Sequence, residues 1–267
     1  MVLNPVWMAL IATLGTWFVT ALGSATVIFF KKTNLKILNS MLGFAAGVMI
    51  AASFWSLLQP AIDRAETCLS APSWLVVTCG FICGAVFIFV SDKVVTYFQK
   101  RANDNTNTPS ITLKRVIMLI FSITLHNIPE GLAVGVAFGA LYNGFSTESL
   151  LAAISVAVGI GLQNFPEVAA VSIPLRREGF SRLKSFLYGQ ASGLVEPVAG
   201  VVGAILVMHI EMLLPFALAF AAGAMILVAV HELIPECQSN RDIHPYFSTM
   251  GIIAGFAVMM LLDVMLG

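Results

Sequence analysis

The sequence predicts an all-α integral membrane protein with eight transmembrane helices. Hydrophobic residues make up 58% of the 267 residues and charged residues only 10%, whereas soluble domains carry roughly 25% charged residues. The mean hydropathy is +0.92. The apolar runs reach the length of about 20 residues that a membrane helix needs. The predicted spans cover residues 5–30, 37–60, 73–98, 112–141, 149–175, 182–208, 213–236 and 246–266.

Little sequence remains between the spans, so we expect one transmembrane domain over residues 1–267, with its longest loop at about 99–111. Lysine and arginine follow the first, third, fifth and seventh spans, and only Arg64 falls on the other side. Because basic loops stay in the cytoplasm, we expect the 99–111 loop inside and both termini outside, in the cell membrane. The first span has no basic residues before it, which indicates an anchor and not a cleaved signal. The zero net charge, without a basic patch, argues against nucleic acid as a partner.

An internal repeat relates the second span to the seventh. Residues 44–50 read Phe-Ala-Ala-Gly-Val-Met-Ile and recur at 220–226 with one change. The third and eighth spans share the spacing of four residues, namely Gly80, Ile82, Gly84 and Asp92 against Gly251, Ile253, Gly255 and Asp263. Two such spans five helices apart cross the bilayer in opposite senses, which is typical of the inverted repeats of transporters. We therefore expect spans 1–3 and 6–8 to surround a central pair, spans 4 and 5, although no match between spans 1 and 6 is visible.

The two central spans each carry a polar pentad. Residues 126–130 read His-Asn-Ile-Pro-Glu, and residues 163–167 read Gln-Asn-Phe-Pro-Glu. The first and fifth positions lie on one helix face, and ionisable groups at membrane depth are costly and indicate function. Pro129 and Pro166 are expected to kink their helices and to free two backbone carbonyls. The sixth span adds a third carboxylate beside a third proline, in Glu196-Pro197.

The pentads predict a site for a divalent metal ion. One imidazole, two carboxylates and an amide oxygen come from His126, Glu130, Gln163 and Glu167. Nitrogen and oxygen ligands without thiolate suit Zn²⁺, and also Fe²⁺, Mn²⁺, Co²⁺ or Cd²⁺, whereas Mg²⁺ and Ca²⁺ favour oxygen alone. The alternative is a buried hydrogen-bond network that only stabilises the helix bundle.

Three further polar positions lie toward the span ends. Residues 231–236 read His-Glu-Leu-Ile-Pro-Glu, so His231 and Glu232 are either an exit for an ion or a solvated helix end. The proline at position 235 removes the second histidine of a His-Glu-x-x-His zinc-protease helix, which disfavours that class. Asp92 at the inner side and Asp63 at the outer side fit either a vestibule or a plain interface.

Residues 126–131, His-Asn-Ile-Pro-Glu-Gly, resemble the fourth-span signature of the ZIP (Zrt-/Irt-like protein) metal transporters. The eight spans, the outward termini, the Glu-Pro of the sixth span and the His-Glu of the seventh extend the resemblance along the chain. Gln163 points to the prokaryotic GufA-like branch. The resemblance implies uptake of zinc, and often iron, manganese or cadmium, into the cytoplasm.

The resemblance also implies roles for single residues. A first metal would bind His126, Glu130, Gln163 and Glu167. A second metal would bind Asn127, Asn164 and Glu196, with Glu130 and Glu167 bridging the two ions. His231, Glu232 and Asp92 would lie at the inner exit, and Asp63 at the entrance. Asn164 stands where an aspartate can stand in this branch, so the second position has one anionic ligand fewer.

The leading hypothesis is an alternating-access uptake transporter in which the block containing spans 4 and 5 moves relative to the rest. Its partners are divalent metal ions, bound as cargo, and the lipid bilayer, and no prosthetic cofactor is expected. A homodimer is left open. The competing hypotheses are an intramembrane zinc-dependent hydrolase, which lacks a clear hydrolase motif, and a membrane scaffold or receptor with a structural polar cluster.

Overall fold

The computed structural model describes residues 4–29, 34–103, 113–177, 179–239 and 244–266. Within these ranges every regular element is a helix, and seven helical segments are long and apolar enough to cross a membrane. The chain is therefore an all-α, multi-pass membrane protein. The fourth predicted span corresponds to a 27-residue helix that is not among the seven, so the count of eight stays a prediction.

The helices agree closely with the predicted spans. Their bounds are α1 Pro5–Phe29, α2 Leu35–Ala52, α3 Gln59–Cys68, α4 Ser73–Asn103, α5 Leu113–Gly139, α6 Thr147–Arg177, α7 Arg182–Ala191, α8 Val195–His209, α9 Leu214–Val228, α10 Ile234–Gln238 and α11 Tyr246–Leu266. Short segments join or follow them, namely η1 Ser53–Leu58, η2 Ala140–Asn143, η3 Ser192–Leu194, η4 Glu211–Leu213 and η5 Ala229–Leu233. The predicted loop at 99–111 begins too early, because α4 continues to Asn103. Residues 104–111 of that loop lie outside the described residues.

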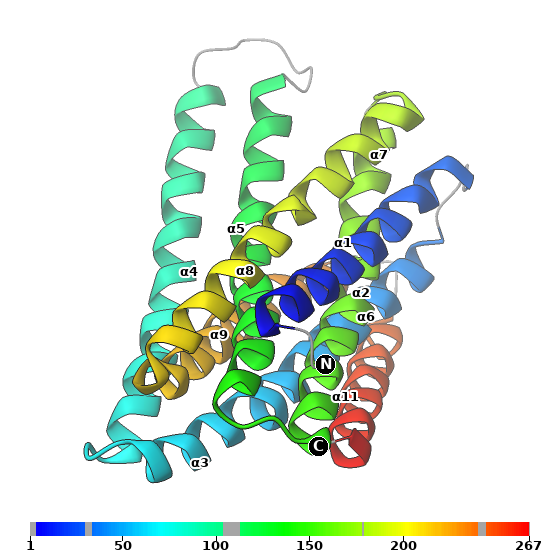
Figure 1. Cartoon of the computed structure of the whole chain (residues 1–267). Coiled ribbons are helices and arrows are strands. Elements are labelled where there is room, and N and C mark those ends of the chain that lie inside the picture. The colour runs from blue at the N-terminus through cyan, green and yellow to red at the C-terminus, as the bar shows by residue number, and fades with distance from the viewer. Residues whose placement is uncertain (1–3, 30–33, 104–112, 178, 240–243, 267) are drawn as a thin grey trace.

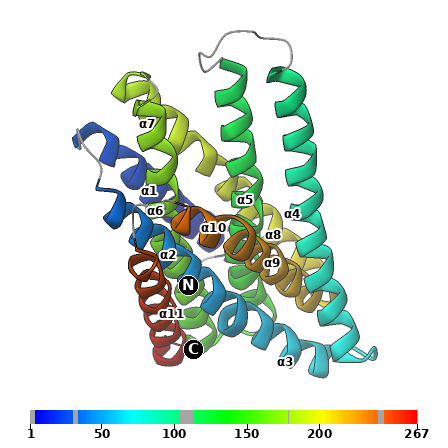
Figure 2. The same cartoon turned by 180° about the vertical axis from the view of Figure 1, so that it is seen from behind.

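Helices α5 and α6, which carry the pentads, lie in the middle of the bundle. Figure 1 shows α1 and α8 in front of them, and Figure 2 shows α2 and α9 on the opposite face. The contacts agree, since α1 packs on α6, α8 on α5, α2 on α6 and α9 on α5. Both ends of the chain lie in the lower half of the bundle, away from the tips of α4 and α5 (Figure 1). The two pentads are thereby enclosed by helices on both sides.

The internal repeat is visible in the packing. Helix α2 packs on α11, and its counterpart α9 packs on α4. A Cβ atom added to Gly84 would overlap the carbonyl oxygen of Phe220, and one added to Gly255 would overlap that of Phe44. These four residues are the pairs that the sequence matched. A reciprocal contact of this kind is what a two-fold relation between two units produces. The same two-fold relation makes the packing of α1 on α6 equivalent to the packing of α8 on α5. No sequence match between α1 and the sixth span was found.

Two π-helical segments occupy equivalent places in the repeats. Ser53 begins η1 and Ala229 begins η5, each nine residues after the matched Phe44 and Phe220. Segments of this kind are rare and frequently occur at functional sites. The sequence analysis did not predict them.

The two pentad prolines lie inside continuous helices. Helices α5 and α6 continue through Pro129 and Pro166 without a break in either helix, and the expected kinks and free carbonyls stay predictions. A proline removes one backbone hydrogen bond, and packing in a crowded bundle preserves the remaining turns. Beside Glu196, the 3₁₀ segment η3 ends at Leu194 and α8 begins at Val195, so the helix geometry changes next to the third carboxylate.

Candidate metal centre

The first polar contact of the centre joins the two pentads. Gln163 on α6 donates from Nε2 to Oε1 of Glu130 on α5, at 2.9 Å. Both side chains are buried, at 0% and 1% exposure. Each pentad places its first and fifth residues on one face of its helix. The structure therefore brings Glu130 and Gln163 together as the sequence predicted.

The second contact joins α6 to α8. Asn164 donates from Nδ2 to Oε1 of Glu196 at 2.9 Å, and both residues are buried. Helix α8 reaches α5 closely here, because a Cβ added to Gly131 would lie 2.6 Å from the carbonyl oxygen of Glu196. The glycine after the first pentad is thus needed for the position of the third carboxylate.

These two contacts decide how the amides are oriented. An amide nitrogen faces the carboxyl group when that group is ionised, because an ionised carboxylate only accepts hydrogen bonds. The amide oxygens of Gln163 and Asn164 therefore point away from their partners. Among the described residues, buried oxygens without a hydrogen-bond partner include Glu130 Oε2, Gln163 Oε1, Asn164 Oδ1 and Glu167 Oε1. These four atoms, which we call the acceptor set, come from α5 and α6 and include no donor.

The charges of the centre also favour a cation. Glu130, Glu167 and Glu196 are close enough to repel one another when ionised, and Glu167 also lies within electrostatic range of Glu232. Repulsion between carboxylates is strong inside a bundle, where the effective dielectric constant is low. Buried charges are normally paired or coordinate a metal. The acceptor set therefore has the chemistry of a cation site.

His126 makes a contact that the sequence analysis did not predict. Its Nε2 lies 2.9 Å from Oε1 of Glu232 on η5, and the two side chains are 11% and 30% exposed. The sequence predicts His126 beside the pentad carboxylates, and the family resemblance implies that Glu232 lies at a separate exit. Within the described ranges, no three His, Cys, Asp or Glu side chains are arranged to hold a metal. In this conformation, the imidazole is thus directed to η5.

The other predicted residues differ in how deeply they are buried. His231 on η5 is exposed, Asp92 on α4 is partly buried, and Asn127 on α5 is buried. Asp63 on α3 is exposed and accepts a hydrogen bond from Gln59 at 3.0 Å. The structure therefore does not gather these residues into the centre with Glu130 and Gln163.

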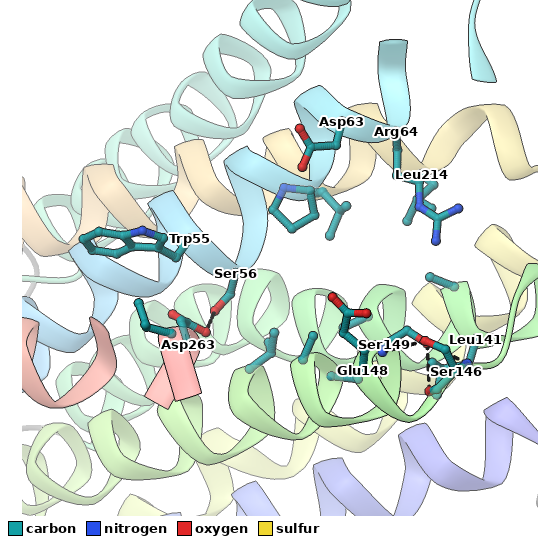
Figure 3. A pocket seen from close by; sticks show the side chains of 18 residues that line it. Trp55, Ser56, Asp63, Arg64, Leu141, Ser146, Glu148, Ser149, Leu214 and Asp263 are labelled. Carbon is teal, nitrogen blue, oxygen red and sulfur yellow. Dashed lines mark hydrogen bonds between the residues drawn. The ribbon is translucent and has the colours of Figure 1, made fainter. Parts of the chain in front are cut away.

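A pocket of about 460 Å³ opens beside α3. Asp63 and Glu148 lie on opposite walls of it (Figure 3). Asp263 lines the pocket too, and its Oδ1 accepts hydrogen bonds from Ser56 at 2.7 Å and Ser155 at 2.8 Å. The placement of Asp63 in this pocket agrees with the vestibule that the sequence suggested.

Sequence reasoning missed the residues that support Glu196. Thr16 on α1 donates to Glu196 Oε2 at 2.5 Å, and Thr20 lies 3.4 Å from Oε1. A signal was present, because Thr13, Thr16, Thr20 and Ser24 recur every three or four residues on an apolar span and all are buried. Such spacing puts hydroxyls on one helix face. A polar stripe in a membrane helix indicates contact with other polar groups.

Comparison with known proteins agrees with this geometry. The family model described as ZIP zinc transporter matches residues 5–116 and 104–263. The chain belongs to the ZIP family. It is 38% identical to the zinc transporter ZIP11 of Xenopus tropicalis, over 99% of this chain and 98% of the relative. It is 32% identical to the zinc transporter GufA of Myxococcus xanthus, over 97% and 98%, and 34% identical to the zinc transporter ZIPB of Bordetella bronchiseptica, over 93% and 78%.

The ZIP assignment confirms the resemblance found in residues 126–131, including the prokaryotic GufA-like relatives. It also bears on the competing hypotheses. These relatives are named as transporters, which favours a transporter over an enzyme. The names of the relatives do not identify the metal ligands, which depend on the geometry of the site.

Proposed function

We propose that this chain takes up divalent metal ions, chiefly zinc, into the cytoplasm. The observation that carries the proposal is the acceptor set, because four buried oxygens without a donor are best satisfied by a cation. The names of the relatives support zinc as the substrate. The ion is cargo and not a resident cofactor.

The proposed transport site lies between α5 and α6. Glu130, Gln163 and Glu167 contribute oxygens from the acceptor set. His126 completes the ligands if its side chain turns from Glu232 toward Glu130, its neighbour one helical turn away. A nitrogen and three oxygens suit Zn²⁺, and Fe²⁺, Mn²⁺ or Cd²⁺ are further substrates by the same chemistry. The second position would comprise Asn127, Asn164 and Glu196, with Glu130 and Glu167 bridging the two ions.

The proposed path crosses the bundle from the pocket beside α3 to η5. Asp63 lies in that pocket, which faces outward if both termini lie outside the cytoplasm. At the other end, Glu232 already contacts His126, so an ion leaving the site meets Glu232 first. His231 follows on the same segment, and Asp92 is the remaining acidic candidate for the inner exit. This direction requires insertion in the cell membrane with the α4–α5 connection inside.

Two groups of helices support an alternating-access mechanism. Helices α1, α5, α6 and α8 pack as the pairs α1–α6 and α5–α8, whereas α2, α4, α9 and α11 pack as α2–α11 and α4–α9. Movement of the first group against the second would expose the site alternately to the two sides. The pentads lie on the moving group and Glu232 on the other. The contact between His126 and Glu232 would then form only on one side of the cycle.

Zinc uptake into proteoliposomes tests the proposal. Wild-type protein is expected to take up ⁶⁵Zn²⁺ along its gradient, and Glu167→Ala and His126→Ala are expected to remove the uptake. Glu211→Ala is the matched control, because Glu211 is an exposed carboxylate on η4. Full uptake by both site variants, folded by size-exclusion chromatography, refutes the site. Absence of uptake in the wild type, together with hydrolysis of a peptide or ester, would favour the hydrolase instead.

A further inference from the structure

The carboxylate of Glu196 is held by donors from two helices. Thr16 donates to Oε2 at 2.5 Å, and Asn164 donates to Oε1 at 2.9 Å. Thr20 lies 3.4 Å from Oε1 and 3.2 Å from the carbonyl oxygen of Thr16. A hydroxyl has one proton, so each threonine shares it with a backbone carbonyl oxygen, and the second acceptor of Thr16 is the carbonyl oxygen of Thr13 at 3.0 Å. The contact of Thr16 with Glu196 is the shorter of its two, so Thr16 is the principal donor from α1.

The surroundings leave Glu196 no room to move. Glu196 is 0% exposed, and Thr16 and Thr20 are 3% and 2% exposed. A Cβ added to Gly193 would lie 3.0 Å from Thr20 Cγ2 and 3.1 Å from Glu196 Oε1. Thr16, Thr20, Glu196 and Gly193 thus form a close-packed unit, which we call the α1 clamp.

Glu196 differs from Glu130 in whether a carboxylate oxygen is left without a hydrogen-bond partner. Glu130 Oε2 has no partner among the described residues, whereas both oxygens of Glu196 accept hydrogen bonds. The free atom next to Glu196 is instead Asn164 Oδ1, which is buried and without a partner. Its direction follows from the bond that its own Nδ2 makes to Glu196.

We propose that Thr16 and Thr20 are positioning residues, and that Glu196 orients the Asn164 amide instead of binding metal. The centre then holds one divalent ion, with Asn164 Oδ1 as an additional oxygen ligand. Partners that orient a ligand without touching the metal are a common feature of metal sites. This inference rests on the proposed function and replaces the second metal position that the family resemblance implied.

Variants of α1 test the clamp through the affinity for Cd²⁺ or Zn²⁺ in detergent. Thr16→Val keeps the shape and removes the donor, and we expect the affinity to fall by about 10- to 100-fold. Thr16→Ser restores a hydroxyl and is expected to restore the affinity. Thr13→Val is the matched control, because Thr13 is equally buried and bonds to the carbonyl oxygen of Ala9. Equal affinities for Thr16→Val and Thr13→Val would overturn the positioning role.

The number of ions separates the clamp from a second metal site. Anomalous diffraction from wild-type crystals soaked in Cd²⁺ is expected to show one ion between α5 and α6, outside the ligand distance of Glu196. An ion within ligand distance of Glu196 overturns the inference, and this measurement needs only the wild-type protein. Asn164→Asp replaces the donor by a second carboxylate facing Glu196, so this variant is expected to bind two ions.

This inference and the proposed function fail in different ways. If the inference is wrong, the wild-type protein still takes up zinc but binds two ions in its centre. If the proposed function is wrong, the protein takes up no zinc, whatever the number of bound ions. Uptake and ion counting on the same preparation therefore identify which of the two is wrong.

Discussion

The π segments η1 and η5 hold equivalent positions in the two repeats but carry different side chains. Trp55 and Ser56 of η1 correspond to His231 and Glu232 of η5. Ser56 donates to Asp263, which lines the pocket beside α3, whereas Glu232 faces His126 of the proposed metal centre. One backbone irregularity thus presents a neutral hydroxyl in one repeat and a carboxylate in the other.

The comparison indicates which features the repeats share and which became specialised. The shared features are backbone ones, namely the π segments and the glycine contacts of α4 with α9 and of α11 with α2. The specialised features are side chains that contact a residue outside the repeat, as Glu232 contacts His126 of α5. The contact of Glu232 with His126 is therefore a departure from the symmetry of the two repeats.

The largest expected effect concerns the shared frame. Gly84→Ala and Gly255→Ala each push a Cβ into a backbone carbonyl of the facing helix, and overpacking of this kind costs typically about 1–3 kcal/mol. Both variants are expected to lower the thermal unfolding midpoint in detergent by similar amounts. Gly15→Ala is the control, because nothing lies within 4 Å of the added Cβ. Destabilisation by only one of the pair would break the equivalence of the repeats.

The next effect concerns the specialised side of the comparison. Glu232→Gln removes the first carboxylate that the ion meets on leaving the site, and zinc uptake is expected to fall by roughly tenfold, which corresponds to about 1.4 kcal/mol in the barrier. Initial rates of ⁶⁵Zn²⁺ uptake at saturating and at low zinc measure the change. Glu236→Gln serves as control, because Glu236 is an exposed carboxylate on α10. Equal losses in both variants would remove the special role of η5.

Uptake should also decrease as the pH falls. Protons compete with the metal for the imidazole and the carboxylates, so metal binding becomes weaker in acid and stronger toward neutral pH. If each ion displaces one proton, the apparent affinity changes by about tenfold per pH unit. Uptake assays at several external pH values measure the slope. Ser56→Ala should keep the wild-type slope, and a rise of uptake in acid would contradict this competition.

The smallest effect is expected in η1. Ser56→Ala removes one hydrogen bond to Asp263 while Ser155 still donates to the same oxygen, so the loss is about 1 kcal/mol. This corresponds to about a fivefold increase in the KM for zinc at most. Ser155→Ala, measured in the same assay, is expected to have a similar effect. A loss as large as that of Glu232→Gln would show that the two π segments are functionally alike.

Much of the fold was predictable from residue types along the chain. The predicted eighth span, 246–266, coincides with α11, and the match of residues 44–50 with 220–226 reappears as reciprocal packing of glycines. The pentads, too, were visible in the sequence as polar groups at membrane depth. Each of these signals is local or periodic, so it survives without knowledge of tertiary contacts.

The less predictable features depend on contacts between helices. The contact of His126 with Glu232 joins residues about a hundred positions apart, and nothing in either local sequence specifies it. The hydroxyl stripe of α1 was readable at helical spacing, but its target, Glu196, was not. Helices α5 and α6 continue through Pro129 and Pro166, where neighbouring helices compensate for the backbone hydrogen bond that a proline removes.

The sequence by itself determined the class of the molecule, its family, the positions of its long apolar helices and the candidate residues of the site. The physical reason is that a bilayer demands long apolar helices with internally satisfied backbones, and every polar group inside them stands out. Tertiary structure alone decided which carboxylate each amide faces, and hence which oxygens remain free. That choice depends on the approach of α8 to α5 and of α1 to α8, because hydrogen-bond direction is set by the position of the partner.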